Sequence, residues 1–144
     1  MMKRAFFSIL ALTTALILPL PALAHNPLQV RQLLETGACP GCDLGGADLS
    51  GAHLIGADLR GADLQGAKLV KANLEGADLT GANLYQANLM GAFVTNATLD
   101  GANLTKVNLA NATLINAQTA GAVMTGINTA GANIYGSGIA IGGE

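Results

Sequence analysis

The chain has 144 residues, of which 51% are apolar, 3% are aromatic and 19 are glycine. With so few aromatic side chains, a core has to be built from Leu and Ala, which suits a narrow stack better than a broad globule. The formal net charge is −2. This mild acidity argues against a nucleic-acid-binding protein, because such a protein needs a basic stripe that displaces counterions.

Residues 1–24 have the pattern of a cleavable signal peptide. The first four residues include Lys3 and Arg4, residues 5–18 are an apolar run, and Ala22-Leu23-Ala24 matches a small-x-small cleavage site. The apolar run is short for crossing about 30 Å of hydrocarbon, so the pattern favours cleavage before His25 over a membrane anchor. Loss of Lys3 and Arg4 leaves 5 basic and 9 acidic residues, a net charge of −4.

A signal of this Sec type predicts export to the periplasm or the thylakoid lumen, or out of the cell. The sequence has no second apolar stretch long enough to span a bilayer. We therefore expect no membrane association after the signal is cleaved.

Residues 25–41 are expected to form a short capping helix and a loop. Asn26 is a good N-cap, Pro27 fits the first helical turn, and Gly37 supplies a left-handed stop. A helix this short is marginal alone, so its apolar face is expected to pack on the start of the following segment. The spacing i, i+3, i+4 assigns three residues to that face: Val30, Leu33 and Leu34.

Cys39 and Cys42, in Cys39-Pro40-Gly41-Cys42, are the only cysteines. In an exported protein such a pair is most simply a structural disulfide, here tying the loop to the segment that follows. The alternative is a redox C-x-x-C, a motif that normally opens a helix after a strand, whereas this one follows a predicted helix. We expect no metal site, because His25 and His53 add too few and too scattered ligands.

Residues 42–141 are twenty blocks of five residues. The central residue is Leu in every block from Leu44 to Leu89, and the residue two before the centre is Ala in all but four blocks. Residues spaced five apart do not fall on one face of an α-helix, and they do not fall on one face of a flat strand either. All of them turn inward if the chain bends by a right angle after each block. Four blocks then close a square turn of twenty residues, with glycines near the corners.

This A-(D/N)-L-x-G pattern resembles the pentapeptide-repeat family over residues 42–141. The resemblance implies an all-β fold, a right-handed quadrilateral β-helix, with about five four-sided turns, an N-terminal capping α-helix and a tail at 142–144. The helix followed by C-P-G-C is similar to exported members from cyanobacteria and plastids. The residues that define the family are structural, so the resemblance implies no activity.

The square turn predicts that residues twenty apart stack into columns on the outer walls. Two columns begin with paired carboxylates, Asp43 over Asp63 and Asp58 over Asp78. Two carboxylates on a convex wall give too few oxygens for Ca²⁺ and no concave site for catalysis, so we interpret them as a solvated acidic end.

Other outward positions become apolar toward the C-terminal half. They form a candidate interaction surface, although scattered apolar residues are also ordinary on protein surfaces. The candidate residues are Val70, Met90, Phe93, Ile115 and Tyr135.

The final turns have the weakest pattern. Thr119 and Thr129 stand where other blocks have Leu, and no capping helix follows. An open β-edge invites fraying or pairing with a second copy, so we expect a homodimer through the C-terminal turn.

No catalytic constellation, cofactor motif or metal-ligand set is present in the sequence. It is therefore interpreted as a non-catalytic exported scaffold that presents a rigid β-helical surface to an unidentified protein partner. The first alternative is a thiol–disulfide redox role for Cys39 and Cys42. A remote alternative, taken from the family resemblance, is a DNA-mimicking topoisomerase inhibitor, which needs a longer, more acidic rod and a cytoplasmic location.

Overall fold

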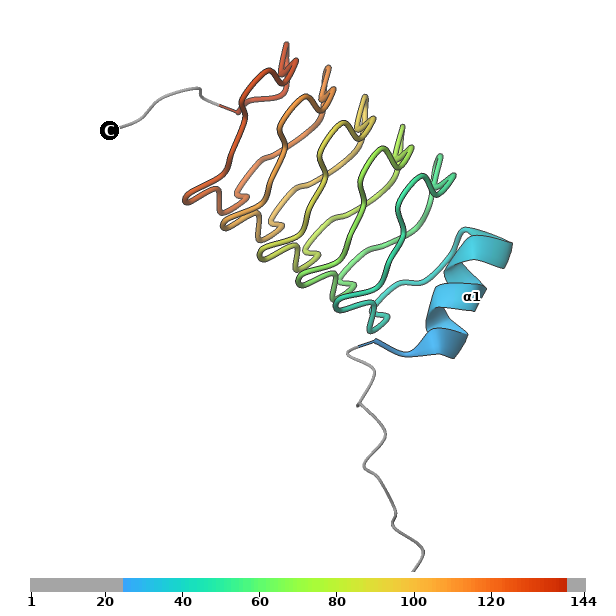
Figure 1. Cartoon of the computed structure of the whole chain (residues 1–144). Coiled ribbons are helices and arrows are strands. Elements are labelled where there is room, and N and C mark those ends of the chain that lie inside the picture. Colours follow the sequence, from blue (N-terminus) through green and yellow to red (C-terminus); the bar gives the residue numbers. More distant parts are fainter. Residues whose placement is uncertain (1–24, 140–144) are drawn as a thin grey trace, which may run out of the picture.

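The computed structural model describes residues 25–139, which form one helix followed by a stack of four-sided rings (Figure 1). The predicted signal peptide (1–24) and tail (142–144) lie outside the described residues. Within residues 25–139, no helix combines the length and apolar character needed to cross a membrane.

The predicted helix is α1 (Pro27–Thr36). The Asn26 side chain accepts a hydrogen bond from the backbone N–H of Leu28, and Pro27 occupies the first turn, where its missing N–H costs nothing. Gly37 ends the helix in the left-handed conformation, with φ +70°, and its N–H donates to the Leu33 carbonyl. In Figure 1, α1 lies against the first ring of the stack.

The rings are held in a register of twenty residues, as the sequence predicts. Isolated parallel bridges join residues twenty apart, from Asp43 and Asp63 to Thr113 and Asn133. Within this pattern, the Leu64 N–H donates to the Asn83 carbonyl at 2.8 Å, and the Asn83 N–H donates back to the Ala62 carbonyl at 2.9 Å. Each ring therefore satisfies backbone groups of the ring before it and the ring after it.

The interior is a column of Leu and Ala side chains. The central residues from Leu44 to Leu114 are at most 2% exposed. Of the alanines two positions before them, Ala52, in the first ring, is half-buried, and the rest are buried. Packed Leu and Ala side chains therefore fill the centre of the described rings.

Asparagine side chains form ladders on the outer wall. Asn128 donates from Nδ2 to Asn108 Oδ1 at 3.0 Å, and Asn108 donates to Asn88 Oδ1 at 3.2 Å. The Oδ1 atom of each of these residues also accepts the N–H two residues ahead. These bonds tie successive rings through side chains as well as through the backbone.

The corners of the rings require a left-handed backbone conformation. Most corners use glycine, such as Gly81 with φ +67°. Six corners hold other residues with φ between +54° and +58°, where a Cβ atom is strained. These six residues are Lys71, Gln86, Asn96, Lys106, Asn111 and Asn116.

The last ring differs from the ones below it. Thr119, which the sequence marks as a weak core position, is buried and donates from its hydroxyl to the Ser137 carbonyl at 2.7 Å. The Ser137 hydroxyl donates to the Ile134 carbonyl, and Ile139 is 7% exposed. In contrast, Met124, Thr129 and Ile134 are half-buried. Among residues 25–139, the three sides formed by 122–136 have no further ring stacked on them.

We expect Thr119→Val to lower the free energy of unfolding by about 1–2 kcal/mol, because the change keeps the volume and leaves the buried Ser137 carbonyl without its donor. Urea denaturation measures the effect. Thr129→Val is the matched control, and it is expected to be neutral or mildly stabilising. Equal losses in the two variants would contradict the role given to the Thr119 hydroxyl.

A second prediction concerns the corners. Gln86→Gly is expected to raise the free energy of unfolding by up to about 1 kcal/mol, because glycine relieves the strained left-handed conformation. Gly81→Ala is expected to lower it by a similar amount, although a Cβ there would meet no atom within 4 Å. Thermal unfolding followed by circular dichroism tests both, and a loss of stability in Gln86→Gly would overturn the assignment of strain.

Candidate functional site

The five predicted surface residues border one side of the coil. This side, called here the Phe93 face, consists of residues 92–96, 112–116 and 132–136 together with the corner residues Val70 and Met90. Val70 and Met90 are twenty apart at one corner, and Ile115 and Tyr135 are twenty apart at the other. Phe93 lies between these corners and is bridged to Asn73 and Thr113. The structure thus places the predicted residues around one surface.

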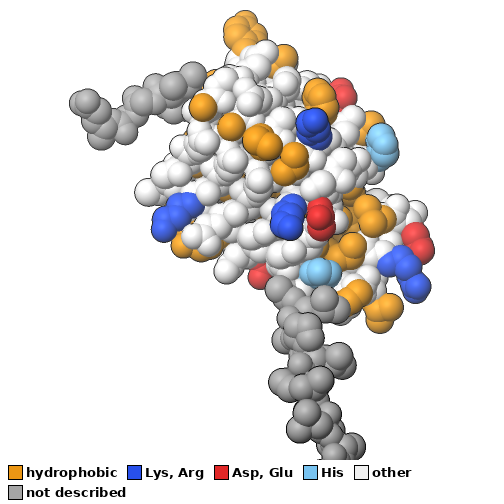
Figure 2. Space-filling model, viewed as in Figure 1, with side chains coloured by type: hydrophobic (Ala, Val, Ile, Leu, Met, Phe, Trp, Pro, Cys, Tyr) orange, Lys and Arg blue, Asp and Glu red, His pale blue; other side chains and the backbone are white. Residues whose placement is uncertain are grey.

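The exposed fractions on the Phe93 face differ from residue to residue. Val70 and Ile115 are half-buried, whereas Met90 is 40%, Phe93 51% and Tyr135 78% exposed. Residues 92–96, 112–116 and 132–136 contain no charged residue. Figure 2 shows hydrophobic side chains in small groups on the visible part of the stack. The Phe93 face is therefore suited to shallow, uncharged contacts.

Sequence reasoning missed Ile55, which is 63% exposed. It occupies the same corner column as Ile115 and Tyr135, at the N-terminal end of the stack. Counting back from Ile115 in steps of twenty residues leads to Ile55, so the repeat pattern alone could have identified it.

The paired carboxylates are held by other side chains. Arg60 donates to both oxygens of Asp58, at 2.8 and 2.7 Å, and its Nε lies 3.8 Å from Asp78. The Arg60 hydrogen bonds lower the pKa of Asp58. Asp63 accepts hydrogen bonds from Asn83 and from the Gln65 N–H, both at 3.0 Å. Sequence reasoning missed the role of Arg60.

Among the residues that the structure describes, no group of three or more His, Cys, Asp or Glu side chains could hold a metal ion. An open hollow of about 270 Å³ lies beside Asp43, Asp63, Gln65 and Gln86. A second hollow, of about 430 Å³, lies at the last ring beside Asp100, Thr119 and Ser137.

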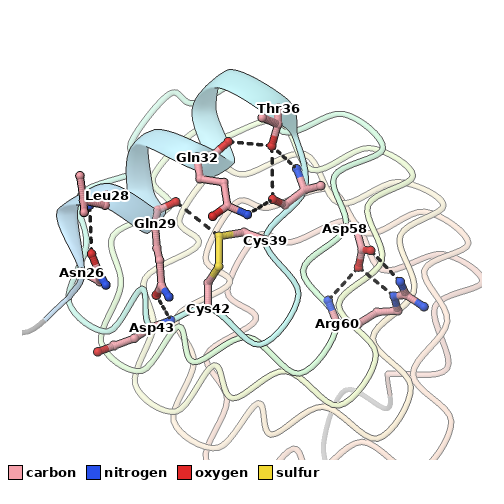
Figure 3. The surroundings of a disulfide bond; sticks show 11 residues. Asn26, Leu28, Gln29, Gln32, Thr36, Cys39, Cys42, Asp43, Asp58 and Arg60 are labelled. Carbon is pink, nitrogen blue, oxygen red and sulfur yellow. Dashed lines mark hydrogen bonds and ion pairs between the residues drawn. A yellow bond between two sulfur atoms is a disulfide. The ribbon is translucent and has the colours of Figure 1, made fainter.

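The cysteine pair lies at the opposite end, under α1 (Figure 3). The two sulfur atoms are in bonding contact, with the Cα atoms 5.4 Å apart. The Cys39 N–H donates to the Asp58 carbonyl, and Ala38 is bridged to Asp58. Cys39 thus has the place that Leu takes in later blocks. The stacking pattern begins at Ala38, whereas the sequence places its start at Cys42.

The packed face of α1 also differs from the prediction. Leu33 is 1% exposed and Val30 is half-buried against the core, but Leu34 is 53% exposed. The contacts of the face are completed by polar residues at helical spacing, Gln29 and Gln32. An apolar periodicity alone does not reveal such a polar contribution.

The family profile described as pentapeptide repeats matches three overlapping stretches, residues 39–69, 57–96 and 95–128. No curated protein matches the chain. A pentapeptide repeat protein of known structure from the cyanobacterium Cyanothece 51142 is 29% identical, with a TM-score of 0.62, over 76% of this chain and 91% of that chain. Another, from the thylakoid lumen of Arabidopsis thaliana, is 36% identical, with a TM-score of 0.49, over 68% of this chain and 62% of that chain.

The profile match covers most of the coil, and pentapeptide repeat proteins fold as right-handed quadrilateral β-helices. The resemblance seen in the sequence is therefore confirmed: the chain belongs to the pentapeptide repeat family.

Proposed function

We propose that this protein is a non-catalytic, exported scaffold that binds a protein partner through the Phe93 face. Pentapeptide repeat proteins are generally structural repeat proteins. The observation that carries the proposal is the exposure of Met90, Phe93 and Tyr135 beside stretches 92–96, 112–116 and 132–136, which contain no charged residue. Apolar and aromatic side chains of this kind are enriched at the centres of protein interfaces.

The proposal includes the ends of the chain. Residues 1–24 would direct export to the periplasm, the thylakoid lumen or the outside of the cell and then be removed. In such an oxidising compartment Cys39 and Cys42 would remain joined as a structural disulfide. With α1 as the N-terminal cap, the β-helix would comprise about five four-sided turns, counted from the twenty blocks of the sequence.

The charge distribution disfavours the DNA-mimicking alternative. The last acidic residue before residue 140 is Asp100, and residues 101–139 carry one charged side chain, Lys106. A mimic of the regularly spaced phosphates of DNA needs negative charge along its whole length. Residues 101–139, about two of the five turns, lack it.

The partner prediction is tested by introducing a photo-crosslinking amino acid at position 93 or 135. We expect both positions to crosslink to the same protein in the native compartment, and Phe93→Asp to abolish the Tyr135 crosslink. The matched control places the same group at Thr80, an exposed position on another side, with no crosslink expected. Equal crosslinking from Thr80 would contradict a specific Phe93 face.

We also propose a homodimer through the open C-terminal ring, where Met124 and Ile134 are half-buried. Sedimentation is expected to show a monomer–dimer equilibrium that Ile134→Lys shifts to monomer, because a charge would have to be buried at the contact. Ile55→Lys, at the other end of the stack, is the control and is expected to leave the dimer intact. A strict monomer whose last ring is protected from hydrogen exchange would contradict the dimer.

A further inference from the structure

We propose that α1 and the Cys39–Cys42 disulfide form a redox-responsive clasp. In the oxidised protein α1 shields the disulfide from reductants, and reduction of the disulfide releases α1 from the first ring. This inference rests on the disulfide proposed above and goes beyond its role as a structural crosslink.

The first step is that α1 holds both residues that flank the cysteine loop (Figure 3). On one flank, Gln32 donates from Nε2 to the Ala38 carbonyl at 2.9 Å, and Thr36 accepts the Ala38 N–H at 3.1 Å. On the other flank, Gln29 Oε1 accepts the Asp43 N–H at 2.7 Å. Both contacts come from one element, so their geometry depends on the distance between the flanks.

The second step is that the disulfide adds a covalent constraint to this distance, beside the corner hydrogen bonds from the Cys42 N–H to the Cys39 carbonyl (3.2 Å) and from the Gly41 N–H to the Arg60 carbonyl (2.8 Å). The disulfide holds the Cα atoms of Cys39 and Cys42 at 5.4 Å, and Ala38 and Asp43 are their direct neighbours in sequence. Gln29 and Gln32 are three residues apart and therefore project from the same face of α1. Reduction removes the covalent part of this constraint and leaves the loop held by hydrogen bonds alone.

The third step is that the disulfide is buried under the helix. Cys39 is 0% and Cys42 is 6% exposed, and the Gln29 carbonyl oxygen lies 3.4 Å from Cys39 Sγ. Thiol–disulfide exchange requires a thiolate to reach a sulfur atom. An external thiolate can do so only after α1 moves away.

The contacts of α1 are few enough to be released separately. Leu33 is its only buried residue, and the isolated ten-residue helix would be marginal in water. The rings beyond it are bonded to each other, from Leu59 and Asp78 onward, without any part of α1. Because coupling between two equilibria is reciprocal, a disulfide that favours docking of α1 is itself made harder to reduce by that docking.

The reductant in the test is dithiothreitol. One of its thiolates attacks a cystine sulfur and breaks the S–S bond. Its second thiol then closes the ring, leaving oxidised dithiothreitol and two protein thiols, so that two electrons pass to the protein.

The first experiment measures the rate of reduction by dithiothreitol in the intact protein and in two leucine variants. Leu33→Ala removes the buried anchor of α1, and we expect reduction at least tenfold faster than in the wild type. Leu34→Ala changes the neighbouring, exposed leucine of the same helix and is expected to leave the rate unchanged. Equal rates in all three proteins would overturn the shielding by α1.

The second experiment follows amide hydrogen exchange in α1 with and without the disulfide. In dithiothreitol, and in the double variant Cys39→Ala, Cys42→Ala, we expect exchange at residues 29–36 to be at least tenfold faster, with rings beyond Leu64 unchanged. Retained protection of α1 in both samples would overturn the release. Titration of free thiols in the exported protein separates the two proposals: two free thiols there would refute the resident disulfide, whereas α1 that stays protected after reduction would refute the clasp alone.

Discussion

The buried leucine at the centre of each block is the constraint on which the rest of the structure depends. It recurs at a spacing that no helix or flat strand can bury on one face, so the chain has to turn a corner between successive leucines. Once four corners close a ring, the backbone of each ring pairs with its neighbours, and the register of twenty residues follows. The interior of Leu and Ala and the columns on the outer walls are therefore one solution to a single packing problem. The residues available for contacts with other molecules are those on the outer walls and at the two ends of the stack.

The two ends solve the problem of unpaired backbone groups differently. At the N-terminal end, Asn26 donates to the Asp43 carbonyl and the Gln29 side chain accepts the Asp43 N–H, so α1 satisfies groups for which no earlier ring exists. At the C-terminal end of the described residues, Thr119 and Ser137 fold part of one side inward. The other sides keep half-buried core residues. Within residues 25–139, the C-terminal ring therefore keeps more of its inward residues half-buried than the N-terminal end does.

The sequence predicted the register, the helix and the inward residues, because each depends on a local pattern that repeats. What it did not predict depends on single side chains that meet across rings or across α1. Arg60 pairs with Asp58, two residues before it, and lies 3.8 Å from Asp78 of the next ring. Thr119 interrupts the Leu pattern in the sequence, and only the structure shows that its hydroxyl donates a hydrogen bond to the Ser137 carbonyl. Leu34 fits the apolar spacing of its helix, yet Gln29 and Gln32 take the contacts, because the loop flanks offer hydrogen bonds.

The block of five residues also sets the unit in which such a protein can change length during evolution. Gain or loss of four blocks would lengthen or shorten the rod by one ring, about 4.8 Å, and return every later residue to its original wall. Gain or loss of a single block would preserve the buried Leu column yet rotate everything beyond it by a quarter turn. Phe93, which now lies one side of the ring away from the column of Asp58, would then move to another side relative to Asp58. A small duplication could thus reorient a binding surface without disturbing the core.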